Sequence, residues 1–216
     1  MRKASRLAVA GAALCLVVVP APAWAAADPA AGSASAGAAD ITVDGQRAFV
    51  DPTAPCATGT APSGQSDPVR VGTATRFGTA TSTCGLNPDG TANVKATGQR
   101  FETSVLQRYG GPVIRVRAFS AACSTTANGS SGRIELSGVT GITLPQEIPA
   151  NYAMSIPGRT PGAPPVAEIV ANELIAPTPP DGSLTAHALH IRLFPEGGPA
   201  SGDIVLGTAS CDPFGG

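Results

Sequence analysis

The C-terminal third of the chain alternates apolar and polar residues with a period of two. The clearest run, residues 182–194, reads GSLTAHALHIRLF and lies between a Pro-Pro-Asp-Gly turn and a Gly/Pro loop. Such alternation places successive side chains on opposite faces of a β-strand. Residues 182–194 therefore predict a core strand, and residues 203–211 predict a partner strand beside it.

Turn signals divide the rest of the chain into further strands. Asp44-Gly45 suits a type I′ hairpin, residues 68–84 alternate as one strand, and residues 141–144 form another. Residues 166–175 fit a helix face or a strand, and the bounding prolines favour the strand. Turns recur about every eight to twelve residues, and no long segment has a period of 3.6. The sequence predicts an all-β fold, either an antiparallel β-sandwich or a barrel-like sheet.

The first 25 residues predict a signal peptide. A basic start precedes an apolar run over residues 7–19, and Ala23-Trp24-Ala25 is a small-x-small cleavage site. The apolar run is shorter than the roughly 20 residues that span a bilayer. Residues 26–40 are rich in Ala, Gly and Ser and predict a flexible leader. Residues 41–216 predict a single β domain.

The charge balance excludes some partners. Once the three basic residues of the signal peptide are removed, 11 Lys/Arg face 15 Asp/Glu, a net charge of −4 (11 − 15). This disfavours nucleic acid, which needs a clustered positive footprint, and no polybasic segment marks a membrane-bound mature chain. Arginine outnumbers lysine 12 to 2 among many Ala, Gly and Pro residues, which is typical of a GC-rich bacterium. The partners left open are extracellular or cell-envelope proteins and polysaccharides.

Four cysteines remain after signal cleavage: Cys56, Cys84, Cys123 and Cys211. An even number in an exported chain predicts two disulfides, with three connectivities open. We favour Cys56–Cys84 and Cys123–Cys211. The second would close a loop of nearly ninety residues, for which the chain-entropy argument gives ~4.5 kcal/mol. No pair has CxxC spacing, and the sequence predicts no metal cluster, redox site or cofactor.

The C-terminal half resembles the choice-of-anchor P family. The resemblance rests on residues 170–173 (VANE), the Asp181-Gly182 turn, residues 184–193 (LTAHALHIRL) and residues 202–211, with a further match at residues 117–123. It covers roughly residues 113–211. It implies an exported bacterial protein without an assigned activity and with a variable C-terminal sorting signal. The chain has no LPxTG motif or apolar tail after Cys211, so we expect release or non-covalent retention.

The two histidines, His187 and His190, are the first candidates for chemistry. Their spacing would place them together on a helix, but on a regular strand they face opposite sides, so shared metal binding would need a bulge between them. Glu168 and Glu173 read as surface charge, and the chain has no Gly-x-Ser-x-Gly elbow. The sequence favours no catalytic or metal-ligating residue, and whether the protein is an enzyme stays open.

The aromatic residues are the second candidates. The only tryptophan, Trp24, is lost with the signal peptide. Tyr109 and Tyr152 lie in predicted turns or loops and are the candidate sugar-stacking platforms, whereas phenylalanines in strands are expected to be buried. The leading hypothesis is a secreted structural or interaction module at or outside the cell envelope. The alternatives are an extracellular hydrolase with a non-motif active site and a carbohydrate-binding module.

Overall fold

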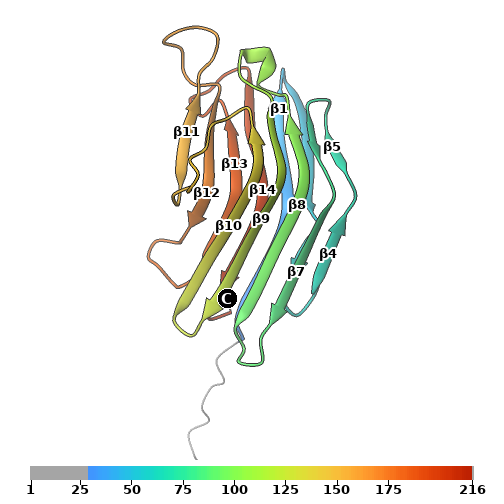
Figure 1. The fold of residues 1–216 in the computed structure, drawn as a ribbon, viewed down its shortest axis with the longest axis vertical. Coiled ribbons are helices and arrows are strands. Elements are labelled where there is room, and N and C mark those ends of the chain that lie inside the picture. The colour runs from blue at the N-terminus through green and yellow to red at the C-terminus, as the bar shows by residue number, and fades with distance from the viewer. Residues whose placement is uncertain (1–28, 216) are drawn as a thin grey trace, which may run out of the picture.

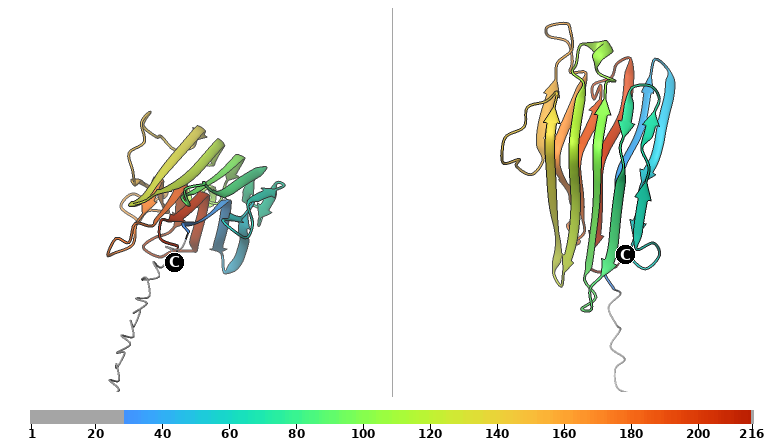
Figure 2. Two further views of the ribbon diagram at one scale, coloured as in Figure 1. Left: turned by 90° about the horizontal axis from the view of Figure 1, so that it is seen from below. Right: turned by 45° about the vertical axis from the view of Figure 1, so that its right-hand side comes forward.

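The computed structural model of the protein describes residues 29–215, and the predicted signal peptide over residues 1–25 lies outside them. Two antiparallel sheets pack face to face as a β-sandwich (Figures 1 and 2). Of the two all-β architectures expected from the sequence, the sandwich is confirmed. Within the described residues no helix is long and apolar enough to cross a membrane.

Sheet A contains the first and last strands of the fold. In spatial order its strands are β11 (Tyr152–Ile156), β12 (Ala167–Ile175), β13 (Leu184–Leu193), β14 (Ala200–Asp212), β1 (Ala31–Val43) and β2 (Gln46–Thr53), with β3 (Cys56–Ala57) also pairing β1. The predicted core strand at residues 182–194 is thus confirmed as β13, with β14 and β12 as its neighbours. The ambiguous segment 166–175 is a strand.

Sheet B contains the middle of the chain. Its order is β10 (Gly129–Thr140), β9 (Ile114–Thr126), β8 (Ala92–Thr103), β6 (Thr75–Phe77) and β5 (Val69–Val71), with β7 (Ala80–Leu86) beside β8 and β4 (Ser63–Ser66) beside β7. A short 3-10 helix, η1 (Gln107–Tyr109), follows β8. The single strand predicted at residues 68–84 is therefore three short strands, and the strand predicted at residues 141–144 is irregular chain.

Residues 31–40 belong to the core, which corrects the predicted flexible leader over residues 26–40. They form most of β1, between β14 and β2, and Ala34, Ala36 and Ala39 are at most 4 % exposed. A Cβ on Gly37 would lie 2.4 Å from the Phe77 ring of sheet B. Large side chains of sheet B fill the space here, so β1 needs small residues. The β domain therefore begins before residue 41.

The Asp44-Gly45 turn joins β1 to β2 as predicted. Both residues have positive φ, 51° and 76°, as a type I′ turn requires. The rest of the core combines alanines with large apolar side chains from both inner faces. Those that are under 2 % exposed include Ile169, Leu189, Ile191, Ile204 and Leu206 in sheet A and Val94, Phe101, Ile114 and Val116 in sheet B.

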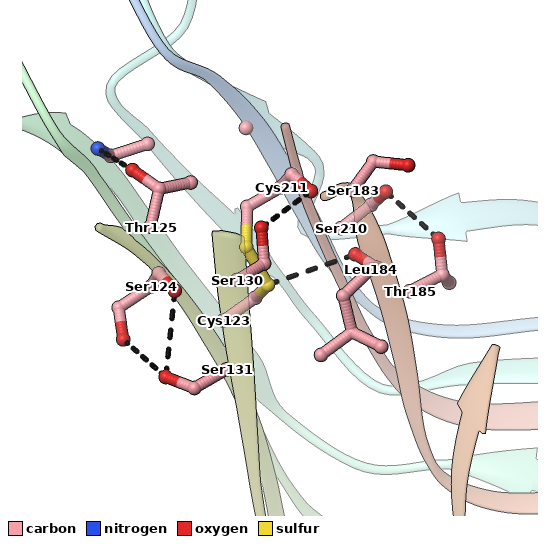
Figure 3. Close-up of a disulfide and its surroundings, with 12 residues drawn as sticks. Cys123, Ser124, Thr125, Ser130, Ser131, Ser183, Leu184, Thr185, Ser210 and Cys211 are labelled. Atoms are coloured by element: carbon pink, nitrogen blue, oxygen red, sulfur yellow. Dashed lines mark hydrogen bonds between the residues drawn. A yellow bond between two sulfur atoms is a disulfide. The ribbon is translucent and has the colours of Figure 1, made fainter. Parts of the chain in front are cut away.

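Both disulfides have the predicted connectivity. Cys56–Cys84 joins β3 to β7, with 5.7 Å between the Cα atoms. Cys123–Cys211 joins β9 to β14, with 5.9 Å between the Cα atoms (Figure 3). Each bond therefore links sheet A to sheet B.

An irregular row crosses sheet A at mid-height. The pairing ladders skip one residue in each of four neighbouring strands, and the register is the same above and below. The skipped residues are Asn172 in β12, Ala188 in β13, Gly207 in β14 and Ala36 in β1. Asn172 and Gly207 have positive φ, 54° and 60°. We call these four residues the irregular row.

The irregular row reverses the alternation of β13. Ala186, Ala188, Leu189 and Ile191 are all fully buried, so the inward positions change from even to odd numbers between Ala188 and Leu189. Sheet B has a matching row, in which the ladders skip Arg100, Arg117 and Gly138. The reversal in sheet A falls between His187 and His190, so it determines on which face of the sheet each of these side chains lies.

Candidate functional site

His187 and His190 lie together on the outer face of sheet A. Because the alternation reverses between them, both point away from the core although their spacing is odd. The prediction that they face opposite sides was wrong, and the irregular row supplies the irregularity that shared ligation would require. Their ring centroids are 5.8 Å apart and the rings are nearly perpendicular, at 88°.

Glu173 of β12 brings the two histidines to one carboxylate. It is the cross-strand partner of His187, and its Oε2 lies 2.7 Å from His187 Nδ1 and 3.0 Å from His190 Nδ1. The second ring nitrogen of His190, Nε2, lies 2.8 Å from Oδ1 of Asp203 in β14. We call these four residues the His–carboxylate cluster.

Three of the four side chains in the His–carboxylate cluster are largely shielded from solvent. The side chains of Glu173, His187 and His190 are only 13–15 % exposed, whereas Asp203 is half exposed. Glu173 is therefore not the surface charge expected from the sequence. Asp203 extends the network to Arg192, whose Nε lies 3.6 Å from its Oδ1, and Arg192 also pairs with Glu168.

The charges of the cluster depend on one another. Burial raises the pKa of Glu173, but hydrogen bonds from His187 and His190 outweigh that effect and lower the pKa to about 2. The hydrogen bond to Glu173 raises the pKa of His190, burial opposes this, and the bond to Asp203 adds to it. Carboxylates only accept hydrogen bonds, so His190 makes both of its bonds as an imidazolium.

The cluster can supply three ligand atoms to a metal ion. One atom each from Glu173, His187 and His190 lie within 4.8 Å of one another. Among the hydrogen bonds of residues 29–215, the partners of the two histidines are carboxylates and neither histidine contacts a serine hydroxyl.

A shallow groove lies beside the cluster on the same face. It has a volume of about 250 Å³ and shares Asp203 with the cluster. Phe49 of β2 lines it with a side chain that is 60 % exposed. Arg47 stacks over the Phe49 ring at 5.1 Å and binds both oxygens of Asp40, at 2.7 and 2.6 Å.

Neither tyrosine provides the predicted sugar platform. Tyr109 packs edge-to-face on Phe194 with 4.9 Å between ring centroids, and its hydroxyl is buried. Tyr152 is half-buried and pairs with Ala171, whose side chain points into the core. Phe49 of β2 is instead an exposed ring, which sequence reasoning missed because it assigned strand phenylalanines to the core. Its position opposite the polar Asp40 is the signal that could have placed it outside.

A larger cleft of about 640 Å³ opens near the β1–β2 turn. Its lining residues include Val71, Val105 and Gln46. Arg108 and Asp44 also line it and form an ion pair with each other. None of the candidate site residues named from the sequence (Tyr109, Tyr152, His187 and His190) lines this cleft.

Comparison of the chain with known protein families, with curated proteins and with solved structures finds no match. The resemblance to the choice-of-anchor P family therefore stays a prediction. The two disulfides are compatible with an oxidising, extracellular setting.

Proposed function

We propose that the protein is a secreted bacterial interaction module that binds polysaccharide at or outside the cell envelope. The predicted signal peptide and the two disulfides support export. The observation that carries the choice of ligand is the exposed Phe49 ring in a groove lined by charged side chains. The larger cleft has no aromatic side chain among its lining residues.

The groove has the two features that sugar binding needs. Arg47 covers one face of the Phe49 ring, and the other face offers an apolar surface for the C–H groups of a pyranose. Around it, the carboxylates of Asp40, Asp51 and Asp203 can accept hydrogen bonds from sugar hydroxyls. A few convergent polar groups around an apolar surface are typical of ligand sites.

The charges of the groove favour a neutral sugar polymer. Three aspartates line it against one arginine, Arg47, and Arg47 is already engaged by Asp40. The mature chain carries a net charge of −4 (11 − 15). An acidic polymer would be repelled by this surface, so the proposed ligand is a neutral glycan.

The test is retention on insoluble polysaccharides. The mature protein is incubated with cellulose, chitin and envelope fractions from the source culture, and the bound fraction is measured. We expect Phe49→Ala to weaken retention at least about tenfold, because loss of an aromatic hot-spot residue costs a binding site about 2 kcal/mol or more. Phe214→Ala is the matched control, since Phe214 is similarly exposed, 57 %, but does not line the groove. Equal retention of both variants, or no retention of the parent, would refute the proposal.

A second candidate function is an extracellular hydrolase. It is favoured by one observation, the hydrogen bond from His190 Nε2 to Asp203, which resembles the base-and-orienter pair of hydrolytic sites. His190 would act as a base only after its Nδ1 is released from Glu173. The double variant His187→Asn/His190→Asn separates the two functions. A binding module retains polysaccharide in this variant, whereas a hydrolase loses the release of soluble sugars or peptides.

A further inference from the structure

Three side chains of the His–carboxylate cluster point their ligand atoms at one place. His187 Nδ1 and His190 Nδ1 both face Oε2 of Glu173, at 2.7 and 3.0 Å. The planes of the two imidazoles are nearly perpendicular, at 88°, and their centroids are 5.8 Å apart, so both rings can turn a nitrogen to the carboxylate without stacking on each other. One ligand atom from each of the three side chains lies within 4.8 Å of the other two.

We propose that Glu173, His187 and His190 form a binding site for a divalent transition-metal ion, for which zinc is the best match. Imidazole and carboxylate ligands suit zinc and its first-row neighbours. Two histidines and one glutamate are a ligand set that zinc uses when its fourth position is left to water.

The two nitrogen–oxygen distances in the cluster are close to those of a tetrahedral site. With bonds of about 2.0–2.1 Å, neighbouring ligand atoms lie about 3.3 Å apart. The nitrogen–oxygen distances of 3.0 and 2.7 Å fall short of this by about 0.3 and 0.6 Å. Rotation of partly exposed side chains provides a movement of this size, so no backbone change is needed.

Asp203 orients His190 for this role. It holds His190 Nε2 at 2.8 Å, so a neutral His190 carries its proton on Nε2 and presents the Nδ1 lone pair to the ion. Histidine ligands of metals generally donate their other nitrogen to such a carboxylate. Because Asp203 binds the opposite side of the ring, it is not a fourth ligand.

Charge also favours a divalent cation here. When both imidazoles are neutral, Glu173 and Asp203 give the cluster a charge of −2, which a divalent ion cancels. The nearby Arg192 already has its own partner in Glu168. This inference does not depend on the proposed sugar binding, because Phe49 is not among the ligands.

The experiment is calorimetric titration of the metal-free, disulfide-intact mature protein with zinc chloride. We expect one ion per chain, and a saturating excess of about a hundredfold over Kd should raise Tm by about 5–10 °C. Glu173→Gln should abolish binding, and Asp203→Asn should weaken it about 10- to 100-fold. Glu168→Gln is the matched control, because Glu168 lies on the same strand but outside the cluster.

A second measurement keeps the test valid if Glu173→Gln does not fold. Cobalt(II) bound at a tetrahedral site absorbs strongly in the visible region, and His187→Asn, which removes a side chain with one hydrogen-bond partner in the cluster, should remove that absorption. The proposal is overturned if the parent binds neither ion, or if Glu173→Gln or His187→Asn binds as the parent does.

Discussion

At the scale of single residues, Glu173 connects the two histidines of the His–carboxylate cluster on the outer face of sheet A. Two imidazoles donate to one of its oxygens, and its side chain is only 14 % exposed. The carboxylate is stable there because the histidines compensate for its loss of water. Its charge is therefore coupled to folding.

The metal-free protein should consequently have a limited range of pH in which the cluster stabilises it. The pKa of Glu173 is lowered to about 2 from 4.5, so its contribution is complete above about pH 4.5 and is lost as the pH falls towards 2. The pKa of His190 is raised from 6.5, so its contribution is complete below about pH 6.5 and is lost as the pH rises through the raised value. The cluster should stabilise the fold most between these limits.

Urea unfolding in the presence of a chelator measures this effect. We expect the contribution of Glu173 to be about 1–2 kcal/mol after allowing for solvent screening. Glu173→Gln should reduce the loss of stability between pH 4.5 and 2 by about this amount, and the remainder belongs to other carboxyl groups with lowered pKa values, such as Asp40 and Asp89. If this variant and the parent lose stability equally over that range, the pKa of Glu173 is not coupled to folding.

At the scale of elements, the irregular row depends on Gly207 in β14. Its φ of 60° lies in the left-handed region. An added Cβ would lie 3.1 Å from Ala188, 3.2 Å from Phe119 and 3.3 Å from Ala121. Both the backbone and the close approach of the two sheets therefore require glycine at this position.

Gly207→Ala should destabilise the protein by about 2–4 kcal/mol. Left-handed backbone in a residue with a side chain costs about 1–2 kcal/mol, and crowding in a packed core adds about as much. Gly85→Ala in β7 is the control, because nothing lies within 4 Å of its added Cβ and its φ is not positive. Chemical denaturation of the two variants should give clearly different midpoints; similar midpoints would show that β14 tolerates a side chain in the irregular row.

The same elements explain what the sequence could and could not predict. Alternation located β13 and β14 because each half of these strands follows a regular period. It misplaced His190 relative to His187 because the reversal at the irregular row is made by backbone conformation, most visibly at Asn172 and Gly207. Its trace in the sequence is a single pair of adjacent apolar residues, Ala188 and Leu189. The small residues at 31–40 do not by themselves suggest a buried face, so the sequence predicts a flexible leader there. In the fold they are buried because large side chains of the opposite sheet, such as Phe77, reach them.

At the scale of the whole molecule, the disulfides join the two sheets of a core that has few aromatic residues. Cys123–Cys211 closes 88 residues and Cys56–Cys84 closes 28. Loop-closure entropy then assigns about 4.6 and 3.6 kcal/mol to them. The sequence leaves three connectivities open and only favours this one. It gives no sign of the contact of Glu173 with the histidines, because that contact depends on how β12 and β13 align.

Removal of the two disulfides should therefore have unequal effects. The double variant Cys123→Ala/Cys211→Ala should lose about 1 kcal/mol more stability than Cys56→Ala/Cys84→Ala, because it frees the longer loop in the unfolded chain. Urea unfolding of both variants measures the difference. A larger loss in the variant without Cys56–Cys84 would mean that native-state contacts, and not loop length, decide the contribution of each bond.

The pairing of β1 with β14 also determines how the molecule would yield to tension. Ala31 and Asp212 are cross-strand neighbours, so the first residue of β1 and the last residue of β14 lie side by side at one end of sheet A. A force that separates them would unzip the ladder one pair at a time, which resists less than two strands sliding past each other in shear. Cys211 is adjacent to Asp212 and is bonded to Cys123, so on that side the load passes directly into sheet B. Under tension β1 would peel away first, while β14 and the cluster beside it kept their shape.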